Sequence, residues 1–161
     1  MKIYLKQFFL FLIYAFACFF SFAQQSQKKP EITRIAKFKP PVVKSFLGMD
    51  TNGAAVTEDE AGQLITLPLK ISDDQNHIYS IDSYHFLYKR KGVIEDEESG
   101  RKQVAFTTVA DVFKITPLPK IWIENIQNGF QKGEEIYFFD IVVKDKTGRK
   151  FFAPDLKITI Q

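Results

Sequence analysis

The chain has 161 residues, with 22 Lys and Arg against 19 Asp and Glu, and one cysteine. This length allows one domain with its own hydrophobic core, so folding requires neither a disulfide nor a metal. A net charge of only +3 excludes the strongly basic surface that nucleic-acid binding needs. The 17 Phe, 6 Tyr and 1 Trp are typical of a packed β core.

The N-terminal 23 residues predict an export signal. Lys2 and Lys6 precede an almost unbroken apolar run over residues 8–20, and small residues occupy the −3 and −1 positions of a cleavage site. We expect cleavage between Ala23 and Gln24, and a periplasmic or otherwise exported product. Without this segment the numbers of basic and acidic residues are nearly equal.

Two alternatives to a cleaved signal are a retained anchor and a lipoprotein. The apolar stretch is shorter than the roughly 20 residues of a membrane-spanning helix, which argues against an anchor. Lipidation at Cys18 is disfavoured because Ala15 stands where a lipoprotein signal normally has Leu or a similar residue. Cleavage after Ala23 leaves no thiol, so it excludes a disulfide, a Cys metal site and a Cys nucleophile.

Residues 24–39 form a polar, basic leader. Its charges are Lys28, Lys29, Arg34, Lys37 and Lys39 against Glu31. We interpret this segment as a solvated leader before the domain, and an arm that contacts an anionic surface is the alternative.

The domain is predicted to span residues 40–161 and to open with extended segments. Pro40 and Pro41 block a helix, and residues 42–49 read as the first strand. Residues 58–62 form a polar stretch closed by glycine. Residues 64–71 alternate as a strand does, and the side chains expected to face the core are Ile65, Leu67, Leu69 and Ile71.

The middle of the chain predicts a hairpin with an acidic tip. Residues 78–91 form a long strand that places three aromatic residues on one face: Tyr84, Phe86 and Tyr88. Residues 101–107 return as its partner, and the tip between them carries acidic residues 95–98. The i, i+3, i+4 spacing of Val109, Val112 and Phe113 favours a short helical turn.

A short helix is predicted over residues 120–127. Pro119 suits its start, where a missing N–H costs nothing, and Asn128-Gly129 suits its end. Trp122 and Ile126 share one helical stripe. We therefore expect Trp122 in the core rather than as a binding anchor, and the helix over one end of the β structure.

Residues 133–161 predict a C-terminal hairpin with a turn at 145–148. Its first strand is apolar on both faces, so it should lie centrally in a sheet, with Phe138 inward. The second strand should turn three residues inward: Leu156, Ile158 and Ile160. These elements predict the all-β class, as a single Ig-like antiparallel β-sandwich domain with one or two short helices.

Three segments of the domain resemble the C-terminal domain of GldM (PorM), a protein of gliding motility and type IX secretion in Bacteroidetes. Residues 83–92 resemble the family's strand that leads into a basic, glycine-containing turn. Residues 133–141 resemble its Gly-x-x-hydrophobic-x-Phe-x-Asp/Asn-Ile strand, and residues 145–149 resemble its turn. The resemblance covers roughly residues 42–161 and rests on motifs that define a fold, not a catalytic site.

This resemblance implies an Ig-like β-sandwich and a protein-binding role in the periplasm. In the family, the domain is thought to reach the ring of secretion proteins associated with the outer membrane. GldM has a retained transmembrane helix and several periplasmic domains before this one, whereas here a cleavable signal leads almost directly into the domain. A motor role is therefore not implied, and the transfer of function is an analogy.

The sequence shows no catalytic, cofactor-binding or metal-binding constellation. Its only histidines are His77, expected in a loop, and His85, expected on a strand. The acidic residues 95–98 offer oxygens to Ca²⁺, but consecutive side chains diverge, so a solvated tip is the preferred interpretation. Asp140 interrupts an apolar strand and is predicted to make structural hydrogen bonds.

We therefore expect a non-enzymatic, exported protein–protein interaction module of the gliding or type IX secretion kind, which needs no cofactor. Its partners would be envelope proteins, with secretion-ring components as candidates, and they would contact a sheet edge or the loops at one end. The alternative is a β-sandwich that binds a small ligand or a glycan. Exposed aromatic residues beside polar groups on one face would favour that alternative.

Overall fold

The computed structural model describes residues 37–98 and 100–161. The predicted signal, its cleavage site at Ala23 and Gln24, and the leader up to residue 36 lie outside the described residues. Residues Lys39–Gln161 form one compact unit. This unit is all-β and sandwich-like with two short helices, which confirms the predicted fold class.

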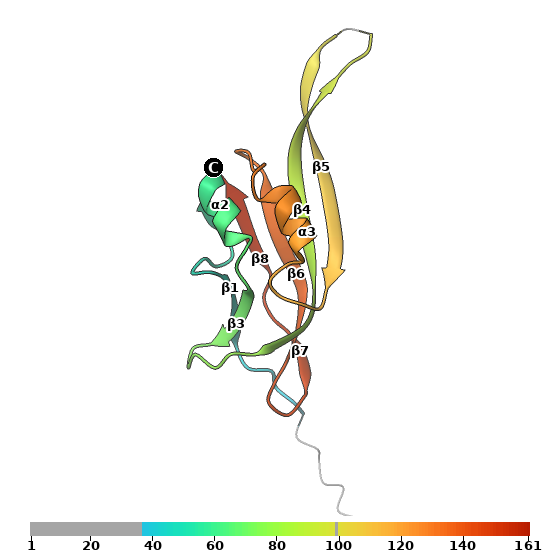
Figure 1. Ribbon diagram of the computed structural model, residues 1–161. Coiled ribbons are helices and arrows are strands. Elements are labelled where there is room, and N and C mark those ends of the chain that lie inside the picture. Colours follow the sequence, from blue (N-terminus) through green and yellow to red (C-terminus); the bar gives the residue numbers. More distant parts are fainter. Residues whose placement is uncertain (1–36, 99) are drawn as a thin grey trace, which may run out of the picture. The chain divides into compact units, whose positions relative to one another are not determined.

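Eight strands and two helices make up this unit (Figure 1). In chain order they are β1 (Val43–Leu47), β2 (Ala54–Val56), α2 (Glu58–Leu64), β3 (Leu69–Asp73), β4 (Ser80–Glu95), β5 (Lys102–Phe113), α3 (Lys120–Ile126), β6 (Glu135–Lys144), β7 (Lys150–Phe152) and β8 (Leu156–Ile160).

The strands form one large and one small sheet. The large sheet has the order β2-β8-β6-β4-β5, with β7 beside β6, and β1 and β3 form a separate antiparallel pair. Neighbours in the large sheet are antiparallel except β2 and β8, which run parallel. β6 is central, as its apolar sequence predicts.

The core lies on one face of the large sheet. Phe86 of β4 and Phe138 of β6 are buried there with ring centroids 5.1 Å apart. Trp122 of α3 packs edge-on against Phe86 at 5.7 Å, so α3 covers this face. The predicted inward residues of β3, Leu69 and Ile71, are also buried, and they belong to the small sheet.

The first part of the predicted 64–71 strand is wrong, because α2 extends to Leu64, a turn follows, and β3 begins only at Leu69; Leu67 is exposed rather than inward. Thr57 caps this helix. Its side chain accepts a hydrogen bond from Glu60 N–H, and the Glu60 carboxylate accepts one from Thr57 N–H, which is a capping box. Gly62 is required where α2 approaches the end of α3, because a Cβ there would lie 2.6 Å from Gln127 O.

The predicted helical turn at residues 109–113 is also wrong. β5 continues through Phe113, paired with β4 as far as Tyr84. Twelve consecutive strand pairs outweigh the weak local preference expressed by three apolar residues in helical spacing.

A bulge in β6 changes which residues face the core. Asp140 has φ of 47°, and the β4–β6 register shifts around it. Ile136 and Phe138 are buried before the bulge, whereas Ile141 and Val143 are buried after it. Asp140 itself is exposed, and it marks the bulge rather than a buried hydrogen-bonding site.

The C-terminal hairpin forms as predicted, with its second strand in two pieces. β7 pairs with the end of β6 and β8 with its beginning. The two pieces flank Pro154, which cannot donate a ladder hydrogen bond. The inward residues of β8 are buried as expected: Leu156, Ile158 and Ile160.

Candidate protein-binding surface

The β4–β5 hairpin projects beyond the rest of the large sheet (Figure 1). β4 pairs with β6 only up to Lys89, opposite Glu135, but it continues to pair with β5 up to Glu95, opposite Lys102. We call Arg90–Glu95 together with Lys102–Thr107 the projecting hairpin. Within the described residues, these two segments pair only with each other.

Apolar side chains are exposed on both faces of the projecting hairpin. The exposed fractions are 65% for Val93, 61% for Ile94, 60% for Val104 and 47% for Phe106. A two-stranded ribbon has no second layer against which such residues can be buried. Exposed apolar side chains on a protruding element are typical of a protein-contact site.

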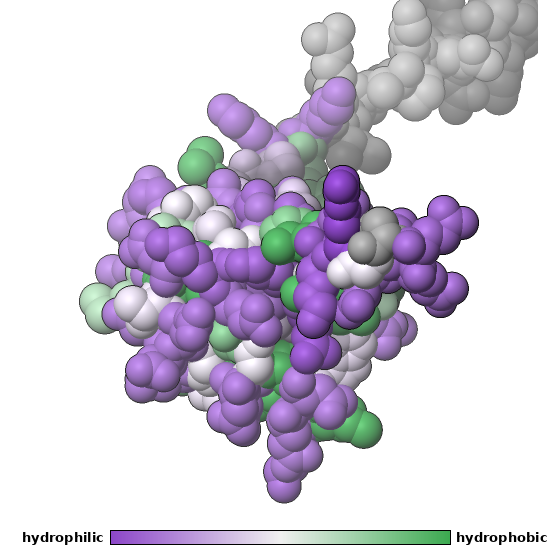
Figure 2. All heavy atoms as spheres, turned by 90° about the horizontal axis from the view of Figure 1, so that it is seen from above, coloured by the Kyte–Doolittle hydropathy of each residue, from purple (hydrophilic) through white to green (hydrophobic). Residues whose placement is uncertain are grey.

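Polar and charged residues flank these apolar positions, two of which, Val93 and Val104, are direct cross-strand partners. Viewed from the end that carries the hairpin tip, the surface is mostly hydrophilic, and hydrophobic residues show only in small separate areas (Figure 2). Such a mixed surface suits a partner that is bound and released better than a permanent subunit interface.

The outer edge of β5 offers unpaired backbone groups. Near the tip, Asp96 N–H donates to Arg101 C=O at 2.9 Å. Antiparallel ladders alternate bonded and outward-pointing residues, so the even-numbered residues of β5 point their N–H and C=O groups away from β4. Val112 agrees with this pattern, because its N–H donates to the Asp111 side chain at 2.7 Å. The remaining outward residues are Lys102, Val104, Phe106, Thr108 and Ala110.

A buried carboxylate fixes the base of the projecting hairpin. Glu134, just before β6, is 0% exposed and accepts hydrogen bonds from the Tyr88 hydroxyl, Lys91 N–H (2.8 Å) and Gln131 N–H (2.9 Å). Lys91 N–H points toward the side where β6 would continue, and the carboxylate takes the place of the missing strand. Burial raises the pKa of Tyr88, and its hydrogen bond to Glu134 raises it further.

Aromatic rings gather on the face of the large sheet opposite the core. Tyr137 and Phe139 of β6 stack at 5.1 Å, and His85 of β4 contacts Phe139 edge-on at 5.0 Å. The Lys89 ammonium lies 4.7 Å from the Phe106 ring centroid and 3.5 Å from Glu135. Aromatic residues therefore lie beside charged groups here, and most of them contact one another.

The carboxylates of the acidic tip, as far as the structure describes them, are not arranged to bind a metal ion. Glu95 pairs with Lys102 at 3.7 Å, and its neighbours up to Glu98 are exposed. Among the residues that the structure describes, no group of three or more His, Cys, Asp or Glu is placed to hold a metal ion. The tip thus supplies negative charge at the end of the hairpin.

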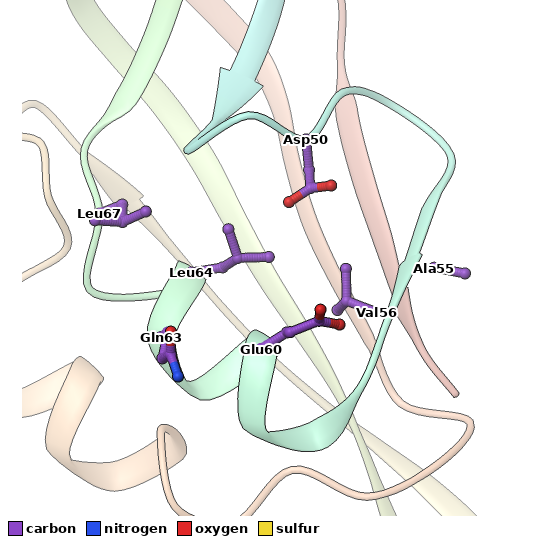
Figure 3. A pocket seen from close by; sticks show the side chains of 7 residues that line it. All are labelled: Asp50, Ala55, Val56, Glu60, Gln63, Leu64 and Leu67. Carbon is purple, nitrogen blue, oxygen red and sulfur yellow. The ribbon is translucent and has the colours of Figure 1, made fainter.

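A small pocket of about 250 Å³ lies between α2, β2 and the loop after β1. The Asp50 and Glu60 carboxylates enter it from different sides, with Leu64 and Val56 between them (Figure 3). Glu60 is already committed to the Thr57 cap, which lowers its pKa. One uncommitted carboxylate in a small open hollow is a weak basis for a ligand site.

His77 belongs to a loop that is organised around Asp73. One Asp73 oxygen accepts hydrogen bonds from Gln75 N–H and His77 N–H at 2.9 Å each. The other lies 3.0 Å from His77 Nδ1 and accepts the Tyr79 hydroxyl at 3.0 Å. His77 is thus used to shape the loop, and His85 packs separately on the open sheet face.

The β6–β7 turn repeats this arrangement around Asp145. One carboxylate oxygen accepts Thr147 N–H at 2.8 Å and Arg149 N–H at 2.9 Å, and the other lies 2.7 Å from Arg149 Nε. Gly148 has φ of 81°, a conformation that glycine adopts without a Cβ clash. Hydrogen bonds, led by that of the Thr147 hydroxyl, lower the pKa of Asp145.

We expect the protein to lose stability as the pH falls from about 5 toward 2. Partial burial would raise the pKa of Asp73, but hydrogen bonds from His77, Tyr79 and Gln75 outweigh it and lower the pKa to about 2. Hydrogen bonds and charge from Lys144 and Lys150 lower the pKa of Asp82 to about 2. A lowered native pKa gives stability that is present above the unfolded pKa and lost as pH falls through the folded one.

Urea unfolding at a series of pH values tests this expectation. Asp73→Asn should flatten the acid limb of the stability profile, because one of the linked carboxylates is gone. An acid limb identical in the variant and the parent would contradict the role assigned to Asp73.

Comparison with known proteins gives no independent indication of what this surface binds. No family model matches the chain, and no characterised protein matches it significantly. In the described part of the chain, no helix has both the length and the apolar character needed to cross a membrane.

The sequence located the hairpin and its acidic tip but not its exposed apolar residues or Glu134. The acidic run and the flanking strands were plain signals. No local sequence pattern predicts the burial of Glu134, because it resembles any charged residue that precedes a strand. The exposed edge also depends on β5 being the last strand of the sheet, which no local pattern specifies.

Proposed function

We propose that this chain is an exported, non-catalytic protein–protein interaction module that contacts its partner through the projecting hairpin. The observation that carries the proposal is the exposure of Val93, Ile94, Val104 and Phe106 on a ribbon that the rest of the sheet leaves uncovered. The acidic tip would lie at the rim of such a contact and affect the association rate more than the affinity.

A non-catalytic role is supported by how the polar side chains are used. His77 is bonded to Asp73, His85 packs on Phe139, and Glu134 is bonded to three donors. In the described residues, no buried side-chain nitrogen or oxygen lacks a hydrogen-bond partner. Neither histidine is hydrogen-bonded to a Ser, Thr or Cys in the described residues, as a base aligned with a nucleophile would be.

We place the module in the cell envelope, with gliding or type IX secretion components as candidate partners. The export pattern of residues 1–23 and the resemblance of residues 83–92 and 133–149 to the GldM C-terminal domain motivate this assignment. It remains an analogy of fold, to be tested by identifying the bound protein.

Affinity purification of the tagged chain from envelope extracts tests the proposal. The Val93→Ser/Ile94→Ser double variant should weaken capture of a discrete partner roughly tenfold or more, because truncating central apolar anchors costs most of the binding energy. The matched control is Phe152→Ser, an exposed residue (70%) on β7, outside the hairpin. Equal capture by both variants would contradict the assigned surface.

The ring cluster on the open sheet face favours a second candidate, glycan binding. Sugars stack on exposed aromatic rings beside polar groups, and Tyr137 and Phe139 lie next to Lys89 and Glu135. The mutual stacking of these two rings leaves less ring surface free, which makes this the weaker candidate. Glycan binding that Tyr137→Ala abolishes and the hairpin double variant retains would favour it.

A further inference from the structure

The free edge of β5 has a defined length. Its outward backbone groups begin at Lys102, where β5 begins, and continue on alternate residues. Val112 N–H is already bonded to the Asp111 side chain, so the edge available to another strand ends at Ala110. The available segment, residues 102–110, has no proline and has a charged residue only at its first position. Such an edge is a template for a further strand.

This segment is compatible with pairing to a second copy of itself. Two copies related by a two-fold axis perpendicular to the sheet run antiparallel, and residues on the same face meet. The midpoint of residues 102–110 is Phe106, which is an outward-pointing residue. Full use of the segment therefore places Phe106 opposite Phe106 of the second copy, in a hydrogen-bonded pair.

The side chains agree with this register. Val104 lies opposite Thr108 of the second copy, and a β-branched pair of this kind stabilises a sheet. Gln103 lies opposite Val109 of the second copy. Just beyond the segment, Arg101 lies opposite Asp111 of the second copy. Lys114 approaches the acidic tip of the second copy, so opposite charges meet at both ends of the pairing.

We propose that β5 pairs antiparallel with β5 of a second copy, centred on Phe106, so that the large sheet continues from one copy into the other. This self-association goes beyond the proposed function and is independent of it. Edge pairing leaves both faces of the projecting hairpin accessible, so a dimer would present two hairpins to a partner.

Sedimentation equilibrium of the full chain, over a concentration series, gives the first test. The parent should be a reversible dimer. Phe106→Glu should dissociate roughly tenfold more readily, because two like charges would face each other across the axis. Within its own chain the new carboxylate lies opposite Lys91, so folding is expected to survive. Phe106→Lys should also weaken the dimer, and a mixture of the two variants should restore association.

Cysteine cross-linking tests the register. In chains that carry Cys18→Ser, Phe106→Cys should form a disulfide between copies, because Cα atoms in a hydrogen-bonded pair lie about 5.5 Å apart. The control Thr108→Cys should not, since its two thiols would be four residues apart along the strand, about 13 Å.

A chain that is monomeric at every concentration would overturn the proposal, as would dimers that cross-link through Thr108→Cys and not through Phe106→Cys. A β5 edge that becomes protected from hydrogen exchange only when a different protein is added would assign it to that protein's strand instead. A monomer that still binds an envelope protein would leave the proposed function standing, which keeps the two failures distinguishable.

Discussion

Replacing Phe138 with Ala is expected to lower the free energy of unfolding by about 3–5 kcal/mol, as large aromatic truncations in cores do. Phe138 is 2% exposed on the central strand β6. Its ring centroid lies 5.7 Å from that of Tyr84 and 5.1 Å from that of Phe86. Both neighbours are buried and held by the β4 backbone, so the surroundings collapse little into the cavity that the truncation creates.

Urea unfolding followed by circular dichroism measures this loss. Phe152→Ala is the matched control, since the same truncation at a side chain that is 70% exposed should cost less than about 0.5 kcal/mol. A loss below about 1 kcal/mol for Phe138→Ala would mean that the inward face of β6 is assigned wrongly.

The second large effect is expected at Glu134. Glu134→Ala removes the acceptor of the Tyr88 hydroxyl and of the Lys91 and Gln131 N–H groups. A donor left unpaired in a buried place costs roughly 1–3 kcal/mol. Only the Tyr88 hydroxyl is fully buried and the two N–H groups are partly buried, so we expect a total loss near the lower end, about 3–5 kcal/mol. Glu134→Gln should lose less, because its amide oxygen can still accept from one or two of the three donors.

Glu135→Ala is the control for this prediction. Glu135 is the next residue and forms two partly exposed ion pairs, with Lys89 at 3.5 Å and Lys157 at 3.1 Å, so its loss should cost less than about 1 kcal/mol. Glu134→Ala should also speed hydrogen exchange at the Lys91 amide. Equal costs for the two glutamates, with unchanged exchange at Lys91, would refute the assigned role of Glu134.

Strand periodicity predicted much of the fold because the burial of alternate residues is a local property. The aromatic face of β4 and the inward residues of β8 follow directly from alternation. The α3 helix follows from Pro119 and the polar stop after it. The apolar residues on both faces of β6 predict its central position in the sheet.

The predictions are wrong where a local pattern is ambiguous, or where pairing with a strand distant in sequence determines the secondary structure. α2 carries a capping-box signature from Thr57 to Glu60, but the segment is short and polar and has no apolar run that predicts a helix. Residues 109–113 form a strand because β4 pairs with them. The inward face of β6 switches at Asp140 because of a bulge, which period-2 patterning cannot predict.

The candidate surface was predictable only in part, for the same physical reason. A projecting hairpin exists because β6 stops pairing at Lys89 while β5 continues to Glu95. The relative lengths of three strands that are far apart in sequence determine this difference. Val93 and Ile94, which lie beyond the strand that the sequence predicts over residues 78–91, are exposed for this reason.

Photo-crosslinking in the native host tests the central claim, the protein-binding role of the hairpin, most directly. A photoreactive amino acid would replace Val93 or Ile94 in the full chain, with position 152 as the control. Because Val93 and Ile94 lie on opposite faces of the hairpin, at least one should give a discrete covalent adduct with a separate envelope protein, identified by mass spectrometry, and position 152 should give none. Absence of any adduct at both hairpin positions, or the same adduct at position 152, would contradict the account.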